Sequence, residues 1–206
     1  MLLIMNIRLD KSEPIVDSLR MKDMLGALSD KRGKIARLIK DGALIQLRRG
    51  LYATQPDIHP YCFAASIYGP SYISFESALS FYGLIPEAVH EITSATIKRP
   101  ALFANRFGYF RYLSIPRSVY TIGIDRIEES GIPFLIASPT KALCDRIARE
   151  PRMRSMSDVM KWAALMRLDG SLEIVPEVLD ACARSYKSPS VRQLWRTVEK
   201  HGRIAT

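Results

Sequence analysis

The stretch "DKRGKIARLIKDGALIQLRRGLYAT", residues Asp30–Thr54, carries a helical pattern followed by two short strand patterns. Its first half places apolar residues at helical spacing, and Gly42 after them is typical of a glycine that ends a helix. The runs "ALIQL" and "LYAT" predict two strands around Arg48-Arg49-Gly50, where Gly50 can take the positive φ of a tight hairpin. We therefore expect a helix followed directly by a β-hairpin.

The positive charge of this stretch lies on one side of the expected helix and at the tip of the hairpin. A helix about 10 Å wide fits the major groove of B-DNA, which is about 12 Å wide, and the hairpin can then reach adjacent phosphates. Alternatively, these cations form only the solvated face of an amphipathic helix. We interpret the following residues as a DNA-contact surface: Lys31, Arg32, Lys34, Arg37, Lys40, Arg48 and Arg49.

Two further helical patterns precede this stretch. The segment "SEPIVDSL" begins with a cap-type serine, Ser12, and places Ile15, Val16 and Leu19 on one helix face, and "MKDMLGALS" repeats this spacing. Two or three helices followed by a basic hairpin are typical of a winged helix-turn-helix. We therefore predict a winged helix-turn-helix DNA-binding domain over residues 1–55.

The charge is distributed unevenly along the chain. The 206 residues include 30 Lys and Arg against 21 Asp and Glu, a net charge of +9, and a strongly cationic protein accumulates at polyanions such as nucleic acid. Residues 55–97 contain no Lys or Arg, and "TQPDIHP" at the start of this gap is the best candidate linker.

The apolar and cysteine content indicates a cytoplasmic protein. No apolar run approaches about 18 residues, so we expect no membrane span, and the N-terminus lacks the pattern of a signal peptide. The cysteines Cys62, Cys144 and Cys182 are odd in number and far apart, which argues against disulfides and favours core positions in a reducing compartment.

The remaining patterns predict a second domain, residues 60–206, in which a small antiparallel sheet packs against helices. Helical patterns cover "YCFAASIYG" and "SFESALSFYGL", and strand patterns cover Glu91–Ile97, Phe107–Ser114, Val119–Ile124 and "GIPFLIAS". The segment "SPTKALCDRIARE" predicts a helix capped by Ser138. Three more helical patterns, "SDVMKWAALMRL", "PEVLDACARSY" and "SVRQLWRTVEKHG", predict a helical C-terminal part, so the expected fold class is α+β.

Three segments resemble the AbiEi family, the antitoxins of type IV toxin-antitoxin systems. The segment "GKIARLIKDGALIQLRRGLYAT" resembles the end of that family's N-terminal winged-helix domain. "YISFESALSFYGLIPEA" is similar to the helix that opens its second domain, and "FLIASPTKALCDRIA" is similar to a later segment. The three occur in the expected order within residues 12–149, and the stretch from Met156 onward has no such match.

The resemblance implies a cytoplasmic bacterial protein that binds the operator of its own operon and neutralises a nucleotidyltransferase-like toxin. It assigns the DNA surface to the seven cationic residues named above. The glycine, leucine and tyrosine of the wing motif, Gly50, Leu51 and Tyr52, are expected to hold the hairpin rather than to contact DNA.

The run "KRPALFANRFGYFRYLSIPR" mixes aromatic and basic residues. Strand alternation places Tyr109, Arg111 and Leu113 on one side and Phe110 and Tyr112 on the other, where we expect core packing. The arginines could meet an acidic toxin surface, further DNA or RNA, or be plain surface charge. We interpret three of them as a possible partner surface: Arg106, Arg111 and Arg117.

The sequence offers no catalytic or metal-binding motif. His59, His90 and His201 have no His or Cys at metal-ligand spacing, and "SPTK" lacks the motifs that accompany an SxxK catalytic pair. We therefore favour a repressor and antitoxin that acts stoichiometrically, without a cofactor. Two alternatives stay open: a winged-helix regulator without a toxin, whose second domain senses a ligand or oligomerises, and a nuclease, which would need paired carboxylates for two metals.

Overall fold

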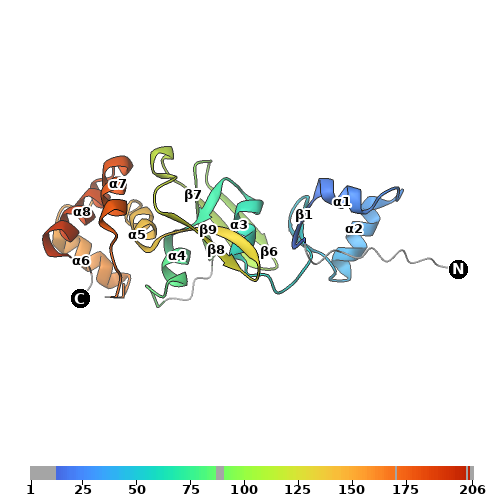
Figure 1. The fold of residues 1–206 in the computed structure, drawn as a ribbon, viewed down its shortest axis with the longest axis horizontal. Coiled ribbons are helices and arrows are strands. Elements are labelled where there is room, and N and C mark those ends of the chain that lie inside the picture. Colours follow the sequence, from blue (N-terminus) through green and yellow to red (C-terminus); the bar gives the residue numbers. More distant parts are fainter. Residues whose placement is uncertain (1–12, 87–90, 170, 203, 205–206) are drawn as a thin grey trace.

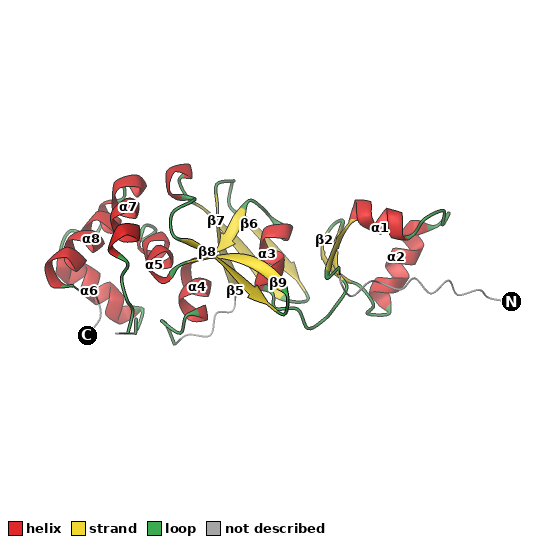
Figure 2. Cartoon of the chain, viewed as in Figure 1, coloured by secondary structure: helices red, strands yellow, loops and turns green. Residues whose placement is uncertain are grey.

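The computed structural model describes residues 13–86, 91–169, 171–202 and 204, which form an elongated molecule of helices and strands (Figure 1). A three-stranded sheet with its helices lies at one end, a six-stranded sheet lies in the middle, and a group of helices forms the other end (Figure 2). The predicted α+β class is confirmed.

Five elements lie in the described residues of the N-terminal part, from residue 13 onward. In chain order they are β1 (Ile15–Asp17), α1 (Ser18–Met24), α2 (Lys31–Lys40), β2 (Ile45–Arg48) and β3 (Leu51–Ala53). The strand β3 lies between the other two and pairs antiparallel with both. A small apolar core joins these elements through Val16, Met21, Leu25, Leu44 and Tyr52.

The predicted helix and hairpin in Asp30–Thr54 are confirmed. The carboxylate of Asp30 caps α2 by accepting a hydrogen bond from the Gly33 amide at 2.8 Å. Gly42, with φ of 74°, ends the helix, and Gly50, with φ of 78°, forms the hairpin turn. A methyl group at position 33 would lie 2.0 Å from Asp30 Oδ2, so the absence of a side chain there permits the cap.

The prediction of a helix from Ser12 to Leu19 was wrong. Ser12 lies outside the described residues, Ile15–Asp17 form β1, and Leu19 is 69% exposed rather than on a core-facing side. The strand forms because β3 offers a hydrogen-bonding edge, a tertiary partner that local spacing does not reveal. The helix begins one residue later, where the Asp17 carboxylate accepts a hydrogen bond from the Arg20 amide at 2.8 Å.

The second part begins with alternating helices and strands. Its first elements are α3 (Tyr61–Ile67), β4 (Ser71–Ile73), α4 (Phe75–Phe81), β5 (Glu91–Thr96), β6 (Ala101–Asn105), β7 (Gly108–Ser114), the 3-10 helix η1 (Arg117–Val119), β8 (Ile124–Glu129) and β9 (Ile132–Ala137). Four helices follow: α5 (Pro139–Ile147), α6 (Met156–Leu165), α7 (Pro176–Tyr186) and α8 (Pro189–His201). None of the helices in the described ranges is long and apolar enough to cross a membrane.

The sheet of the second part is larger than predicted and is mixed rather than antiparallel. Its strand order is β6-β7-β5-β4-β9-β8, and the pairs β5–β7 and β4–β9 are parallel. The prediction missed β4, β6 and β8, and the strand predicted for Val119–Ile124 was wrong, because η1 and a turn occupy most of it. Only the last residue of that segment, Ile124, enters a strand, where it pairs with Ala137.

Two aromatic side chains of β7, Phe110 and Tyr112, lie in the core, as the alternation predicted. Phe110 and Tyr112 are completely buried, whereas Tyr109 is 53% exposed. The Tyr112 hydroxyl donates a hydrogen bond to the Ala64 carbonyl of α3 at 2.7 Å, which attaches that helix to the sheet. The larger core also includes Leu47 and other hairpin residues, so apolar packing is continuous between the two parts.

Candidate nucleic-acid interface

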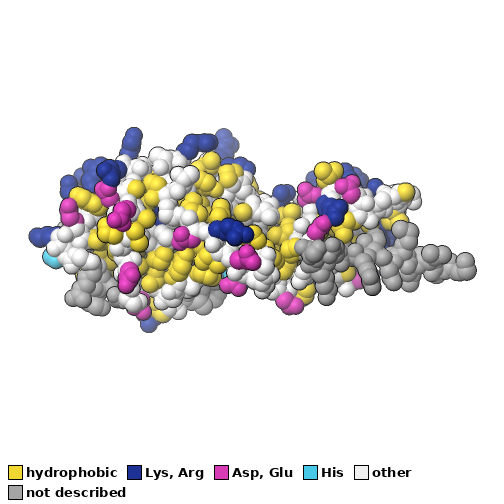
Figure 3. Space-filling view, viewed as in Figure 1, with side chains coloured by type: hydrophobic (Ala, Val, Ile, Leu, Met, Phe, Trp, Pro, Cys, Tyr) yellow, Lys and Arg dark blue, Asp and Glu magenta, His cyan; other side chains and the backbone are white. Residues whose placement is uncertain are grey.

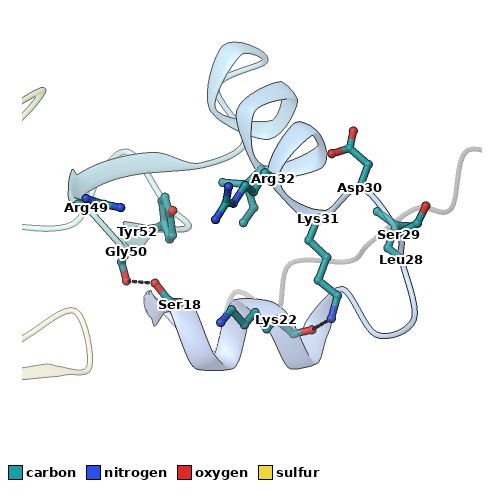
Figure 4. Close-up of a pocket in the computed structure, with 11 residues that line it drawn as sticks. Ser18, Lys22, Leu28, Ser29, Asp30, Lys31, Arg32, Arg49, Gly50 and Tyr52 are labelled. Atoms are coloured by element: carbon teal, nitrogen blue, oxygen red, sulfur yellow. Dashed lines mark hydrogen bonds between the residues drawn. The ribbon is translucent and has the colours of Figure 1, made fainter.

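A basic cavity of about 520 Å³ lies between α1, α2 and the tip of the β2–β3 hairpin (Figure 4). Figure 4 shows cationic side chains from all three elements around this space. They are Lys22 of α1, Lys31 and Arg32 of α2, and Arg49 of the hairpin. The remaining lining residues include one acid, Asp30, whose carboxylate caps α2.

Two hydrogen bonds hold the elements around the cavity together. The Ser18 hydroxyl donates to the Gly50 carbonyl at 3.1 Å, joining the start of α1 to the hairpin turn. The Lys31 ammonium donates to the Lys22 carbonyl at 3.3 Å, joining the start of α2 to α1 (Figure 4). These contacts bring cations from distant parts of the chain to one surface.

The other cations of α2 lie on a different side of the helix. Lys34, Arg37 and Lys40 recur at the i, i+3 spacing of a single stripe, and Arg37 and Lys40 are exposed. Arg37 lies 3.5 Å from the Asp30 carboxylate, but both side chains are 66% exposed, and such a surface pair is weak. The stripe therefore keeps most of its charge accessible to an external anion.

The two hairpin arginines point to different surroundings. Arg49 lines the basic cavity, whereas the guanidinium of Arg48 donates to the Ser66 carbonyl of α3 at 3.5 Å. Burial raises the pKa of the Tyr112 hydroxyl, and the nearby Arg48 charge partly offsets this effect. The structure therefore groups Arg49, but not Arg48, with the cations of α2.

One cation of the cavity was not among the predicted site residues. Lys22 belongs to α1, and its sequence neighbours give no basic helical stripe. Only the packing of α1 against α2 brings it beside Lys31. A prediction of the turn geometry between the two helices would have been needed to find it.

The arginines of the predicted partner surface do not form one cluster. Arg106 precedes β7 and Arg117 follows it, so these two exposed side chains lie beyond opposite ends of a seven-residue strand. Arg111 lies within β7 and forms a two-point ion pair with Glu91 of β5, with a 2.7 Å contact from its Nη2 to Glu91 Oε1. Hydrogen bonding from Arg111 holds the pKa of the Glu91 carboxyl below its usual value.

The "SPTK" segment forms the start of α5 and does not present a Ser–Lys pair to solvent. The Ser138 hydroxyl accepts a hydrogen bond from the Lys141 amide at 3.4 Å, which is a helix cap. The Lys141 ammonium instead lies 2.6 Å from Asp145 Oδ1, and both side chains are completely buried. The Tyr72, Ser74 and Tyr186 hydroxyls all donate to the Asp145 carboxylate.

Burial and the adjacent Asp145 charge raise the pKa values of the Tyr72 and Tyr186 hydroxyls well above the ordinary value, so both stay protonated as donors. This network lies inside the protein and links α5 to β4 and α7. Within the described residues, no group of three or more His, Cys, Asp or Glu side chains is placed to hold a metal ion.

No protein-family model matches the chain, and no curated protein matches it. The AbiEi resemblance therefore stays a prediction based on the three sequence segments that carry it.

Proposed function

We propose that this protein is a DNA-binding transcriptional repressor whose N-terminal part is a winged helix-turn-helix. The observation that carries the proposal is the convergence of Lys22, Lys31, Arg32 and Arg49 from three elements beside the exposed cationic stripe of α2. Surfaces of this kind, rich in Lys and Arg and poor in acids, attract the phosphate backbone of DNA.

The order and pairing of the N-terminal elements support this proposal. A strand, two helices and a hairpin follow one another, and β3 pairs with both β1 and β2, as in winged helices. The helices are joined by a turn that contains Gly26 in a positive-φ conformation, a common feature of helix-turn-helix motifs. In this proposal α2 is the recognition helix and the β2–β3 hairpin is the wing.

The placement of the cations divides the DNA contacts between two surfaces. Lys34, Arg37 and Lys40 face away from the small core and would enter the major groove or contact its phosphates. Arg49 and the cavity cations would contact the phosphates beside the wing. Arg48 has a structural role in this scheme, because its guanidinium is directed to α3.

We further propose that the protein acts as the antitoxin of a type IV toxin-antitoxin system in the cytoplasm, with no catalytic step and no cofactor. The support is the AbiEi resemblance, together with an exposed surface on β6 and β7 where Leu102 is 52% and Tyr109 is 53% exposed. Exposed apolar side chains of this size are suited to contact with a protein partner. Arg106 is exposed at the turn between these strands and adds positive charge at the end of this hairpin.

The DNA proposal is tested by titrating the protein with duplex DNA from upstream of its own gene at several salt concentrations. The variant Lys34→Ala/Arg37→Ala/Lys40→Ala should bind more weakly, and its log K against log salt slope should fall by about 0.9 for each lost phosphate contact. A second variant, Arg32→Ala/Arg49→Ala, tests the cavity in the same way.

The matched control removes two exposed cations from the second part, Arg126→Ala/Lys161→Ala. This control should bind DNA as the wild type does. Equal binding by wild type and both test variants, or no preference for the upstream DNA, would overturn the repressor proposal.

The antitoxin proposal needs its own test. The proposal requires a nucleotidyltransferase-like protein encoded beside this gene, which would be expressed alone and together with this chain. Rescue of growth by the wild type, and its loss in a Leu102→Asp/Tyr109→Asp variant that still binds DNA, would support neutralisation through the β6–β7 surface. Absence of rescue by the wild type would leave a regulator without a toxin as the better description.

A further inference from the structure

A second basic cavity, of about 430 Å³, lies at the opposite end of the molecule between the segment after α5 and the first turns of α8. Four of its seven lining residues are arginines, and none is an acid. They are Arg152, Arg154, Arg192 and Arg196, with Met153, Pro189 and Gln193 completing the lining. In the face shown by Figure 3, Lys and Arg side chains also gather over this helical end.

The backbone around this cavity is held in place by hydrogen bonds from a buried side chain. The Ser190 hydroxyl, 1% exposed, accepts from the Met153 amide at 3.1 Å and donates to the Pro151 carbonyl at 3.0 Å. The Asp158 carboxylate accepts from the Arg154 amide at 2.8 Å and also caps α6. The segment that carries Arg152 and Arg154 is therefore positioned against α8 without any ligand.

The side chains of all four arginines line the same cavity. Arg192 and Arg196 are four residues apart on α8, so their side chains share one helix face and meet those of the fixed segment. In the part of the chain that the structure describes, none of the four guanidinium groups pairs with an Asp or Glu side chain. Four like charges around one cavity repel one another, and a bound anion removes this repulsion.

A neighbouring cavity of about 390 Å³ shares Arg192 with the first. Trp195 lines it, and its half-buried side chain packs against the core. Arg184 lies there too, paired with Asp180. A planar aromatic ring beside a cluster of arginines combines a stacking surface with phosphate-binding groups.

We propose that the two cavities together form a binding site for a nucleoside di- or triphosphate. The phosphates contact the four arginines, whose guanidinium groups can bind phosphate oxygens in a two-point manner, and the base stacks on Trp195. Each cavity falls within the size range of about 300 to 1,000 Å³ that is typical of small-molecule sites. The proposal is independent of DNA binding by α2, because the two surfaces share no residue.

The fluorescence of Trp195 provides a direct test. The chain has two tryptophans, and the buried Trp162 can be replaced by Phe without loss of a hydrogen bond, because its Nε1 has no partner within the described residues. In this Trp162→Phe background, titration with ATP or GTP should quench the remaining fluorescence in a saturable way. Inorganic tripolyphosphate should displace the nucleotide.

Three variants in the same background identify the residues involved. Arg152→Ala/Arg196→Ala should weaken nucleotide binding by about tenfold or more, since hydrogen bonds to charged groups are lost. Trp195→Leu, followed by calorimetry, should weaken binding of ATP but not of tripolyphosphate. Arg99→Ala/Arg126→Ala, which removes the same charge from two exposed positions beside the six-stranded sheet, should bind nucleotide like its parent.

Three results would overturn the proposal. The first is the absence of saturable binding of ATP and GTP to the wild type. The second is equal binding by the Arg152→Ala/Arg196→Ala variant with an unchanged circular dichroism spectrum. The third is binding of single-stranded DNA without terminal phosphates but not of free nucleotides, which would assign the arginines to a nucleic-acid strand.

Discussion

The helices α2 and α5 hold cationic side chains in opposite environments. In the N-terminal part, α2 has no buried residue, and cations such as Arg32 and Lys40 are exposed. In the second part, Lys141 is completely buried beside Asp145. The buried cation is neutralised inside the protein, whereas the exposed cations can attract an external anion. Burial and pairing, rather than charge alone, distinguish a binding surface from a structural ion pair.

The largest expected effect on stability comes from removing the buried counter-charge. Asp145→Asn leaves the Lys141 ammonium without its ionic partner in a completely buried position. We expect a loss of about 3–5 kcal/mol in the free energy of unfolding, because an uncompensated buried charge is strongly destabilising. Urea denaturation followed by circular dichroism measures this loss.

The control replaces both members of the pair by apolar residues, Lys141→Met/Asp145→Leu. This double variant should be more stable than Asp145→Asn, since no charge is left buried alone. The three hydroxyl groups of Tyr72, Ser74 and Tyr186 would lose their acceptor, so full recovery is not expected. A loss below about 1 kcal/mol in Asp145→Asn would show that the pair contributes little.

A smaller loss of stability is expected when a turn glycine of the N-terminal part is replaced. Gly50→Ala places a side chain on a residue with φ of 78° and brings its Cβ within 2.4 Å of Ser18 Oγ. We expect a loss of about 1–3 kcal/mol, from backbone strain and displacement of the Ser18 side chain. Thermal and urea unfolding of the variant measure the loss.

Gly42→Ala is the matched comparison for this change. Its φ of 74° is similar, but no heavy atom lies within 4 Å of an added Cβ, so only the backbone strain remains. Gly50→Ala should therefore be the more destabilised of the two. Equal losses would mean that the contact between the β2–β3 hairpin and α1 adds nothing to the strain.

The half-buried ion pair between Glu91 and Arg111 should contribute less, and in a pH-dependent way. Because the pKa of Glu91 is lowered by its hydrogen bonds to Arg111, the pair stabilises the fold above the ordinary carboxyl pKa. This contribution is lost as the pH falls through the lowered pKa. Wild type and Glu91→Gln should differ in melting temperature near pH 6 and converge towards pH 2, and a difference that is constant with pH would contradict the assignment.

The sequence predicted the elements whose signals are local. The helix α2 has its cap, its apolar spacing and its terminal glycine within one short stretch, and the hairpin has its turn glycine. Strands such as β1 and β4, each of three residues, carry too few positions for an alternating pattern and form only because a partner strand supplies hydrogen bonds. The parallel pairs of the larger sheet depend on connections that periodicity does not encode.

For the candidate site, too, the sequence predicted only the features that depend on local spacing. The stripe of Lys34, Arg37 and Lys40 follows from helical spacing, but the separation of Arg48 from Arg49 depends on how the hairpin packs against α3. The pairing of Arg111 with Glu91 depends on the register of β5 with β7. Charge can be counted in a sequence, whereas its partners become known only from tertiary structure.

The smallest expected effect on stability belongs to the surface with the largest proposed effect on binding. Lys34→Ala/Arg37→Ala/Lys40→Ala removes three accessible cations and one exposed ion pair, that of Arg37 with Asp30. Exposed pairs contribute little, and alanine has the highest helix propensity, so the free energy of unfolding should stay within about 0.5 kcal/mol of the wild type.

The comparison of stability with binding then separates the two roles that a cation can have. Unchanged urea unfolding together with a reduced salt slope for DNA would show that these residues serve a ligand rather than the fold. A loss of several kcal/mol would instead mean that the stripe packs against the protein. The α2 cations would then resemble Lys141, and the difference between α2 and α5 would disappear.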